Sequence, residues 1–309
     1  MSHEVNATPR RGRPRARAHC LAGDTPVLLA DGRAKPIAEL AVGDEVFGTR
    51  EGRYTATRVL AHWSAVEPAY RVTLEDGTRV VAGGDHRFLA EDGWRHLAPG
   101  RRADFEERPF LAEGTRLVGT GRFAEPPAPG ERYRRGYLWG VVRGGLPALP
   151  EVLARARAYA RGELPREGDL VEWPTAADED WVRGFLAGLF DARGSAVAGE
   201  LVLSSSDSAV FDAALVALAR LEVPHAVEVR GVRITGGPAE RLRLLHLVDP
   251  ATARAGVLEG VPVPRAARLG VVSVEPLAVT HRLYDIATGT GDVIANGLVS
   301  HNCSGRAAG

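Results

Sequence analysis

The chain has 309 residues, a formal net charge of zero, and 45% hydrophobic and 25% charged residues, a composition that indicates a globular protein and excludes a fibrous or disordered one. No apolar run approaches the roughly 18 residues that cross a bilayer, and the neutral charge excludes a general attraction of the whole chain to nucleic acid. The first residues, "MSHEVNATPRRGRPRARAH", lack the apolar core of a secretory signal, so we expect a cytoplasmic protein without membrane partners. In that reducing compartment Cys20 and Cys303 are expected to be thiols rather than a disulfide.

The first third of the chain has the pattern of short strands. Residues 1–19 are rich in arginine and proline and predict an unstructured arm. From residue 20 to about 125, apolar stretches alternate with DG or EG turn signals, as in "TPVLLADGRAKPI", "DEVFGTREGRYTATRVLAHWS" and "AYRVTLEDGTRVVAGGDHRFLAEDGW". This spacing predicts an all-β unit, which the linker-like "FAEPPAPGER" ends.

The pattern changes between residues 131 and 264. "EVLARARAYARG" and "DSAVFDAALVALARLEV" have helical periodicity, the second with Asp207 or Ser208 as N-cap. "ELVLSSS", "HAVEVRGVRI" and "RLRLLHLV" are interpreted as strands, so this region is expected to be α/β. The alternating β pattern returns over 265–302, which indicates a β unit interrupted by an inserted α/β unit.

Three blocks of the β unit resemble one known family. "CLAGDTPVLLADGRAKPIAELAVGDEV" resembles the N-terminal splicing motif of inteins, the self-splicing elements of the Hint superfamily. "RVVAGGDHRFLAEDGW" lies where that family has its second motif, and "HRLYDIATGTGDVIANGLVSHNC" resembles its C-terminal pair of motifs. The resemblance implies a mostly β, horseshoe-like Hint splicing domain built from 20–125 and 265–302. It also implies that 1–19 and 303–309 are remnants of the N- and C-exteins, the flanking segments that are the partners of the reaction, in a monomer without a splicing cofactor.

The N-terminal chemistry that the resemblance implies agrees with the residue types present. The thiol of Cys20 would attack the carbonyl of His19 in an N-to-S acyl shift, and His86 would protonate the leaving nitrogen, because imidazole titrates near neutral pH. The family commonly has threonine three residues before this histidine, where the chain has Gly83. Backbone amides or a water are then expected to replace the hydroxyl, and the supporting residues are Gly83, Gly84 and Asp85.

The C-terminal chemistry involves a second nucleophile and a cyclisation. Cys303 would take the acyl group by transthioesterification, and Asn302 would cleave its bond to Cys303 by closing a five-membered succinimide ring. His301 would polarise the carbonyl that is attacked, and Asp285 in "LYDI" corresponds to the family's acidic residue that couples the steps. Gly291 stands where the family has another histidine ahead of the "ANG" segment, a departure that bears on the efficiency of splicing.

The insert resembles a second family. "WVRGFLAGLFDARGS" is similar to the LAGLIDADG helix of DOD-type homing endonucleases, and "YLWGVVRGGL" at 137–146 to a first copy of it. The resemblance implies two helices packed through small residues, here Gly140 and Gly188. The family binds Mg²⁺ through an acid at the eighth motif position, and Gly145 and Arg193 occupy these positions here, with Asp191 at the sixth position of the second copy.

The charge of the insert also bears on its function. Residues 131–264 contain 16 arginines and 18 acidic residues, whereas a surface that clamps a duplex is basic. We therefore expect a degenerate endonuclease that binds DNA weakly, binds no metal, and leaves autocatalytic single-turnover splicing as the function of the chain.

Two alternatives come from other functional classes. One is an active homing endonuclease that cuts DNA at the insertion site with Mg²⁺, against which the missing metal acids count. The other is Hint-type autoprocessing that cleaves without ligation, as in hedgehog-like proteins. Cys303 counts against this second alternative, because cleavage alone needs no nucleophile after Asn302.

Overall fold

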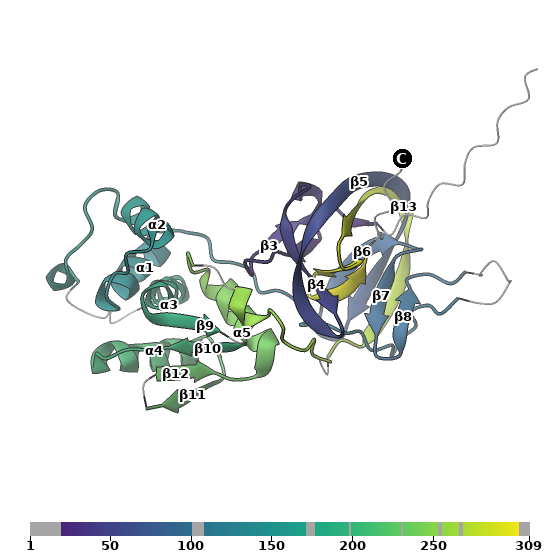
Figure 1. Cartoon of the computed structure of the whole chain (residues 1–309). Coiled ribbons are helices and arrows are strands. Elements are labelled where there is room, and N and C mark those ends of the chain that lie inside the picture. Colours follow the sequence, from purple (N-terminus) through teal and green to yellow (C-terminus); the bar gives the residue numbers. More distant parts are fainter. Residues whose placement is uncertain are drawn as a thin grey trace, which may run out of the picture.

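The computed structural model describes residues 20–100, 108–170, 177–197, 199–229, 231–252, 255–265 and 268–302. The segments 1–19 and 303–309, and with them Cys303, lie outside the described residues. Figure 1 shows two bodies: a β unit formed by the two ends of the described chain and an α/β unit formed by its middle. None of the helices in the ranges given above is long and apolar enough to cross a membrane.

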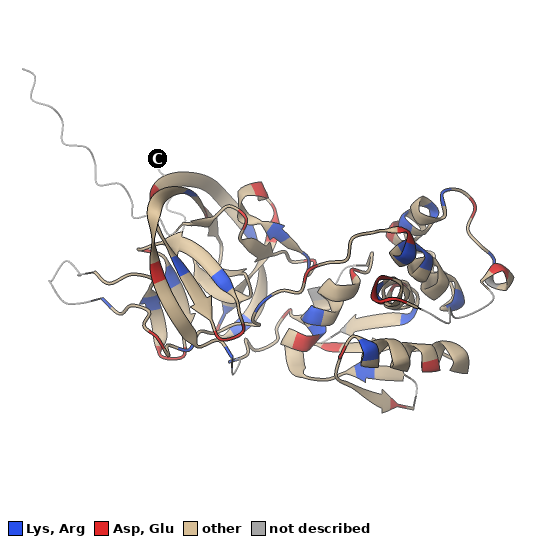
Figure 2. Ribbon diagram, turned by 180° about the vertical axis from the view of Figure 1, so that it is seen from behind, with Lys and Arg blue, Asp and Glu red and all other residues tan. Residues whose placement is uncertain are grey.

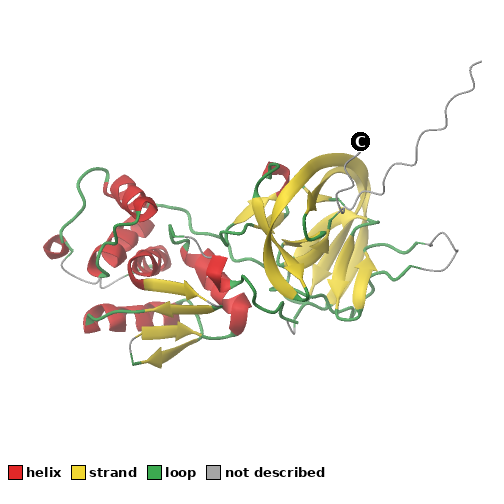
Figure 3. Ribbon diagram, in the orientation of Figure 1, coloured by secondary structure: helices red, strands yellow, loops and turns green. Residues whose placement is uncertain are grey.

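The β unit contains two sheets (Figure 3). The first has five strands, in the order β13 (Val271–Thr288), β1 (Leu21–Ala22), β6 (Arg79–Gly83), β5 (Arg53–Leu74) and β4 (Glu45–Arg50). The second has six strands, in the order β3 (Ala34–Pro36), β2 (Pro26–Leu28), β14 (Asp292–Ala295), β15 (Leu298–His301), β7 (Arg87–Ala90) and β8 (Gly93–His96). A short 3₁₀ helix, η1 (Ile37–Glu39), follows β3. Each sheet thus combines strands from both ends of the described chain: β13 at the edge of the first sheet, and β14 and β15 in the middle of the second.

Two long strands run through the β unit, β5 with 22 residues and β13 with 18. Figure 1 shows them side by side. They pair antiparallel along most of their length, with shifts in register at three places. The sequence predicts the hairpin turns that join the strands, and Gly32 and Gly77 adopt the positive φ that the predicted DG turns require. Apolar residues on alternating positions, such as Val72, Leu74 and Val80, form the core between the sheets.

The α/β unit contains five helices and a four-stranded antiparallel sheet within the described residues. The helices are α1 (Glu131–Arg143), α2 (Pro150–Ala160), α3 (Glu179–Arg193), α4 (Ser208–Arg220) and α5 (Gly237–Val248). The sheet has the order β11 (His225–Glu228), β12 (Gly231–Ile234), β10 (Glu200–Leu203) and β9 (Gly194–Val197). Two 3₁₀ helices, η2 (Glu167–Asp169) and η3 (Ala255–Val257), complete the unit.

Most of the elements predicted for this region are present, and one prediction is wrong. Helices α2 and α4 lie in the two periodic segments, and Asp207 caps α4 by accepting from the amides of Ala209 and Val210. The segment "RLRLLHLV", predicted as a strand, is the larger part of helix α5. Its Arg-Leu alternation imitates a strand, but the proline in the first turn and the buried face at i, i+3 and i+6 favour the helix.

Helices α1 and α3 pack with their backbones in contact. A Cβ added at Gly140 of α1 would overlap the carbonyl oxygen of Phe185, and one added at Gly188 of α3 would overlap that of Tyr137. Gly136 and Gly184, four residues earlier in each helix, make the same type of contact. The glycines therefore remove the side chains that would separate the two helices.

Candidate active site

The first candidate residue of the β unit, Cys20, lies in the interior. Cys20 precedes β1, whose Leu21 pairs with Tyr284 of β13 on one side and Ala82 of β6 on the other. Cys20 is 0% exposed, and its carbonyl oxygen accepts a hydrogen bond from the amide of Gly83 at 3.0 Å. This central position between two strands is what buries the thiol.

A tight turn after β6 brings His86 to the same place. The amide of His86 donates to the carbonyl oxygen of Gly83 at 3.0 Å, so the ring lies immediately beyond the residue that holds Cys20. The ring is 1% exposed, packs on Phe88 with the centroids 4.7 Å apart, and its Nε2 lies 2.7 Å from the hydroxyl oxygen of Ser300. The imidazole is therefore connected by hydrogen bonds both to the start of the β unit and to its last strand.

Asn302 follows that last strand, β15, and is 1% exposed. Its amide donates to the carbonyl oxygen of Gly291 at 3.2 Å, and its side-chain nitrogen Nδ2 donates to the hydroxyl oxygen of Thr288 at 2.9 Å. Its carboxamide oxygen Oδ1 is buried and has no hydrogen-bond partner among the described residues. The nitrogen that would close a succinimide ring is thus held in place by one hydroxyl.

His301 is oriented by its neighbours on β7 and β8. Its Nε2 lies 2.5 Å from a guanidinium nitrogen of Arg87, and its ring meets the edge of Trp94 with the centroids 5.2 Å apart. A guanidinium group can only donate, so Nε2 accepts and the proton of the neutral ring is on Nδ1. His301 can therefore act as a donor through Nδ1 toward a carbonyl group.

Asp285 lies on β13 and is 2% exposed. Because Leu21 pairs with Tyr284 and Ala22 with Leu283, one more step in the same register sets Cys20 opposite Asp285. One carboxylate oxygen accepts from the amide of Ile286 at 2.8 Å. Asp285 is therefore a neighbour of Cys20 in the sheet.

The residues expected to support the N-terminal step differ in what they contact. The N–H of Gly83 is used by the carbonyl of Cys20, so it is not available to the carbonyl of His19, which lies outside the described residues. The carbonyl of Gly84 accepts from Ala98 and Arg108, and the carboxylate of Asp85 forms an ion pair with Arg108. These two residues brace the turn.

Sequence reasoning missed several residues that the fold brings to this site. Ser300 and Thr288 hold His86 and Asn302, Arg87 sets the tautomer of His301, and the carboxyl group of Glu67 on β5 faces the thiol of Cys20. The only available signal is the alternation of β15, which puts Ser300 two residues before Asn302 and so on the same face.

The candidate endonuclease residues in α3 have structural contacts. Asp191 is 4% exposed, and each of its two carboxylate oxygens accepts two hydrogen bonds. The donors are the hydroxyl of Tyr137, the amides of Ala251 and Thr252, and the hydroxyl of Thr252, all at 2.8 or 2.9 Å. Burial and this negative charge raise the pKa of Tyr137, which stays a donor. The carboxylate therefore joins α1, α3 and the segment after α5.

Arg193 and Gly145, at the two positions where the endonuclease family has its metal acids, contact each other's helix. The guanidinium of Arg193 donates to the carbonyl oxygen of Gly144 at the end of α1. A Cβ added at Gly145 would lie against the same guanidinium. Arg193 thus caps the C-terminus of α1, where a cation is stabilised by the helix dipole. Figure 2 shows basic and acidic residues interspersed over this unit.

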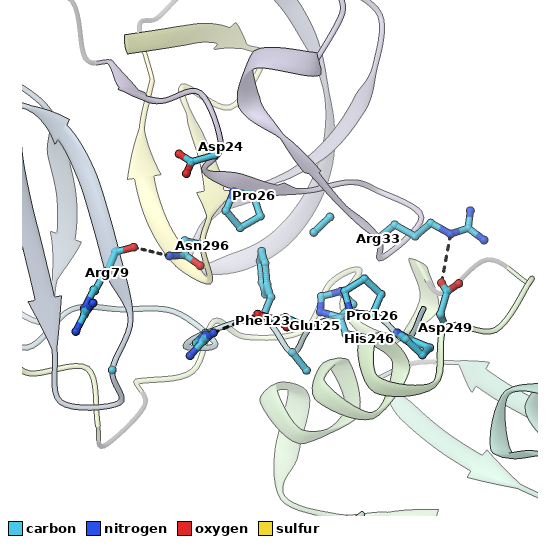
Figure 4. A pocket seen from close by; sticks show the side chains of 15 residues that line it. Asp24, Pro26, Arg33, Arg79, Phe123, Glu125, Pro126, His246, Asp249 and Asn296 are labelled. Atoms are coloured by element: carbon cyan, nitrogen blue, oxygen red, sulfur yellow. Dashed lines mark hydrogen bonds and ion pairs between the residues drawn. The ribbon is translucent and has the colours of Figure 1, made fainter. Parts of the chain in front are cut away.

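A cavity of about 1060 Å³ lies where the two units meet (Figure 4). Phe123 packs edge-on against His246 of α5, whose Nε2 donates to the carbonyl oxygen of Gly32 at 2.8 Å. Nε of Arg33 lies 4.0 Å from the carboxylate oxygen Oδ1 of Asp249, and both residues line the cavity. None of the candidate splicing residues lines it, so this cavity belongs to the junction of the units rather than to the chemistry.

No protein-family model matches the chain. The chain is 35% identical over 121 residues to the replicative DNA helicase DnaB of Rhodothermus marinus. The aligned segment covers 33% of this chain and 13% of the helicase. The chain is 28% identical over 123 residues to the replication factor C small subunit of Methanocaldococcus jannaschii, which covers 34% of this chain and 6% of that protein. The chain thus spans only a small part of these curated relatives.

Solved structures that are similar to this chain include several inteins. The Msm DnaB1 intein splicing domain bound with zinc is 31% identical, with 31% of this chain and 66% of that chain covered and a TM-score of 0.24. The Ssp DnaB mini-intein variant M86 is 12% identical, with 94% and 98% covered and a TM-score of 0.40. A DnaB intein from Synechocystis sp. PCC 6803 is 10% identical, with 92% and 98% covered and a TM-score of 0.38.

Proposed function

We propose that this chain is a protein-splicing element that excises residues 20–302 and joins its two flanks. One observation carries the proposal: a continuous path of contacts connects the two ends of the β unit. The carbonyl of Cys20 is bound by the amide of Gly83, the carbonyl of Gly83 by the amide of His86, and the ring of His86 by Ser300, two residues before Asn302. This path supports the proposal because it connects buried groups from the two ends of the β unit.

The first step forms a thioester. Sulfur of Cys20 attacks the carbonyl carbon of His19, the bond from that carbon to the nitrogen of Cys20 breaks, and His86 supplies a proton to the leaving nitrogen. The buried position of His86 and the hydrogen bond of its Nε2 to Ser300 support this role, because they hold the ring in one orientation. In the second step Cys303 takes the acyl group from Cys20, which frees the first sulfur and forms a new thioester.

The last step releases the element. Nδ2 of Asn302 attacks its own backbone carbonyl carbon, which closes a succinimide and breaks the bond to the nitrogen of Cys303. Nδ2 loses one proton in this step and the leaving nitrogen of Cys303 gains one. The hydroxyl oxygen of Thr288 accepts the hydrogen bond that orients Nδ2, and Nδ1 of His301 can donate to the carbonyl oxygen. The free amino group of Cys303 then takes the acyl group from its own sulfur, and the flanks are joined by a peptide bond.

We infer that the α/β unit does not cut DNA. An Mg²⁺ ion needs oxygen ligands with free lone pairs, and those of Asp191 are already engaged by four donors. Gly145 has no side chain, and Arg193 brings a positive charge that repels a cation. The residues present therefore do not fit a metal, and the active homing endonuclease is the weaker candidate.

The test is the mass of the products from a precursor with a reporter domain at each end. Splicing predicts one product with both reporters and a second with the mass of residues 20–302. Separated reporters without a ligated product would favour autoprocessing by cleavage, and an intact precursor would contradict both functions. Incubation with duplex DNA that carries the uninterrupted insertion site and Mg²⁺ tests the insert, where specific double-strand cleavage would contradict its inactivity.

A further inference from the structure

An acidic side chain lies beside the candidate nucleophile without a role in the steps above. Glu67 is on β5, where strand alternation sets it on one face with Ala65 and Ala69. Ala65 and Ala69 pack in the same small cluster as Cys20 and Leu283. Small residues on either side of Glu67 thus leave room for the thiol and direct the carboxyl group at it.

The carboxyl group of Glu67 is placed by close contact. Its oxygen Oε1 is buried, and no N–H or O–H group of the described residues donates to it. A Cβ added at Gly83 would overlap Oε1, so the absence of a side chain at Gly83 is what admits the carboxyl group. The thiol of Cys20 lies within reach of this carboxyl group and lowers the pKa of Glu67 by interacting with it.

The surroundings make Glu67 a stronger proton acceptor than an exposed carboxylate. Burial raises the pKa of Glu67, the interaction with Cys20 partly offsets this, and the negative charge of Asp85 raises it further. Asp85 is itself paired with Arg108, and the residue opposite Glu67 in β13 is His281. A higher pKa of the carboxyl group lies closer to the pKa of a thiol, which favours proton transfer from the thiol to the carboxylate.

We propose that Glu67 is the proton acceptor of the N-terminal step, a catalytic residue that takes the proton of the Cys20 thiol as its sulfur attacks. The proposal rests on the proposed splicing function. The proton moves from sulfur to a Glu67 oxygen while the carbon–sulfur bond forms, and the leaving nitrogen receives a proton from His86, so one proton is taken up and one is given. A buried thiol in an apolar cluster needs such an acceptor, because burial disfavours a free thiolate.

The decisive variant is Glu67→Gln, which keeps the shape and removes the ability to accept a proton. A Cys303→Ala background leaves Cys20 as the single thiol, and release of the N-terminal reporter by added dithiothreitol then measures thioester formation. We expect Glu67→Gln to slow this release about 10²- to 10⁴-fold and Glu67→Asp to slow it less. The matched control is Glu45→Gln, on an exposed carboxylate paired with Arg58 at the surface, which should release at the parent rate.

A second readout separates proton transfer from a structural or purely electrostatic role. Cysteine labelled with ¹³C at Cβ reports the titration of Cys20 alone in the same background. Removing the neighbouring negative charge should lower the pH of this titration, so a role limited to charge or packing predicts unchanged or faster release in Glu67→Gln. A lower titration pH of Cys20 together with slower release of the reporter in Glu67→Gln supports the proposal. Unchanged or faster release overturns it and leaves splicing intact. If the parent protein with Glu67 releases no reporter, the splicing function itself is wrong. If the titration of Cys20 is also the same in Glu67→Gln as in the parent, Glu67 does not contact Cys20.

Discussion

Asn302 in the β unit and Asp191 in the α/β unit are both buried polar side chains, with 1% and 4% of their surface exposed. The carboxamide oxygen of Asn302 has no hydrogen-bond partner among the described residues, and its nitrogen is held by one hydroxyl. Both oxygens of Asp191, in contrast, are saturated by four donors. Burial alone therefore does not mark a reactive group. A polar atom that is left with free capacity can react, whereas one that is fully bonded holds elements together.

The largest expected effect is the loss of splicing in Cys20→Ala. A methyl group cannot accept the upstream acyl group, so ligation and N-terminal cleavage should both disappear, while some cleavage after Asn302 survives. The masses of the products show this directly. Ligated product from the Cys20→Ala precursor would contradict the assignment of the β unit as the reactive half of the comparison.

The second effect is on the rate of the first step. His86→Ala removes the acid and should slow thioester formation about 10²- to 10⁴-fold, measured by thiol-induced release of the N-terminal reporter. His225→Ala, a partly buried histidine of the α/β unit, serves as the control and should leave the rate unchanged. Equal rates in His86→Ala and the parent would remove His86 from the mechanism.

The third effect is at Asp191 of the α/β unit, where a substitution should change stability rather than a reaction rate. Asp191→Ala leaves several buried donors without an acceptor and should lower the free energy of unfolding of the α/β unit by about 3 kcal/mol. Denaturant unfolding measures this change. The exposed Asp212→Ala on α4 should cost less than about 0.5 kcal/mol. A stable Asp191→Ala variant that loses a divalent-cation signal in calorimetry would instead make Asp191 a ligand.

The smallest expected effect is on the cleavage at Asn302. Thr288→Val keeps the shape of the side chain but removes the hydroxyl that holds Nδ2, a neutral hydrogen bond worth about tenfold in rate. C-terminal cleavage in a Cys20→Ala background isolates this step. Thr280→Val, at an exposed position of the same strand, is the control. An undiminished rate in Thr288→Val would show that the hydroxyl does not position the nucleophilic nitrogen.

The sequence allowed parts of this fold to be predicted because their signals are local. The DG turns at Gly32 and Gly77 and the N-cap Asp207 depend on a few neighbouring residues, and all three have the predicted geometry. Helix α5 was mistaken for a strand because its leucines fit both periods, and only its proline start and tertiary burial decide between them. The local pattern therefore predicts an element correctly where the apolar residues fit only one period, and fails where they fit both the helical and the strand period.

The partners in the site depend on pairings that no local pattern contains. Ser300 meets His86 across 214 residues, and the place of Glu67 beside Cys20 depends on how far β5 extends past its last pair with β6. A shift of one residue in either strand would turn these side chains to the opposite face. The candidate reactive residues could thus be named from motifs, whereas the residues that contact them could be named only from the register of the sheets.

The overlap of Oε1 of Glu67 with the Cβ position at Gly83 makes the two sites exclusive. With this backbone, a side chain at residue 83 displaces the carboxyl group, so a threonine there excludes the present position of the Glu67 carboxyl group beside the thiol. An evolutionary path between the two arrangements must therefore change both positions, and each single change passes through a chain with either a collision or an empty space beside the thiol. In a set of descendants of this chain, the residues at 67 and 83 should accordingly vary together.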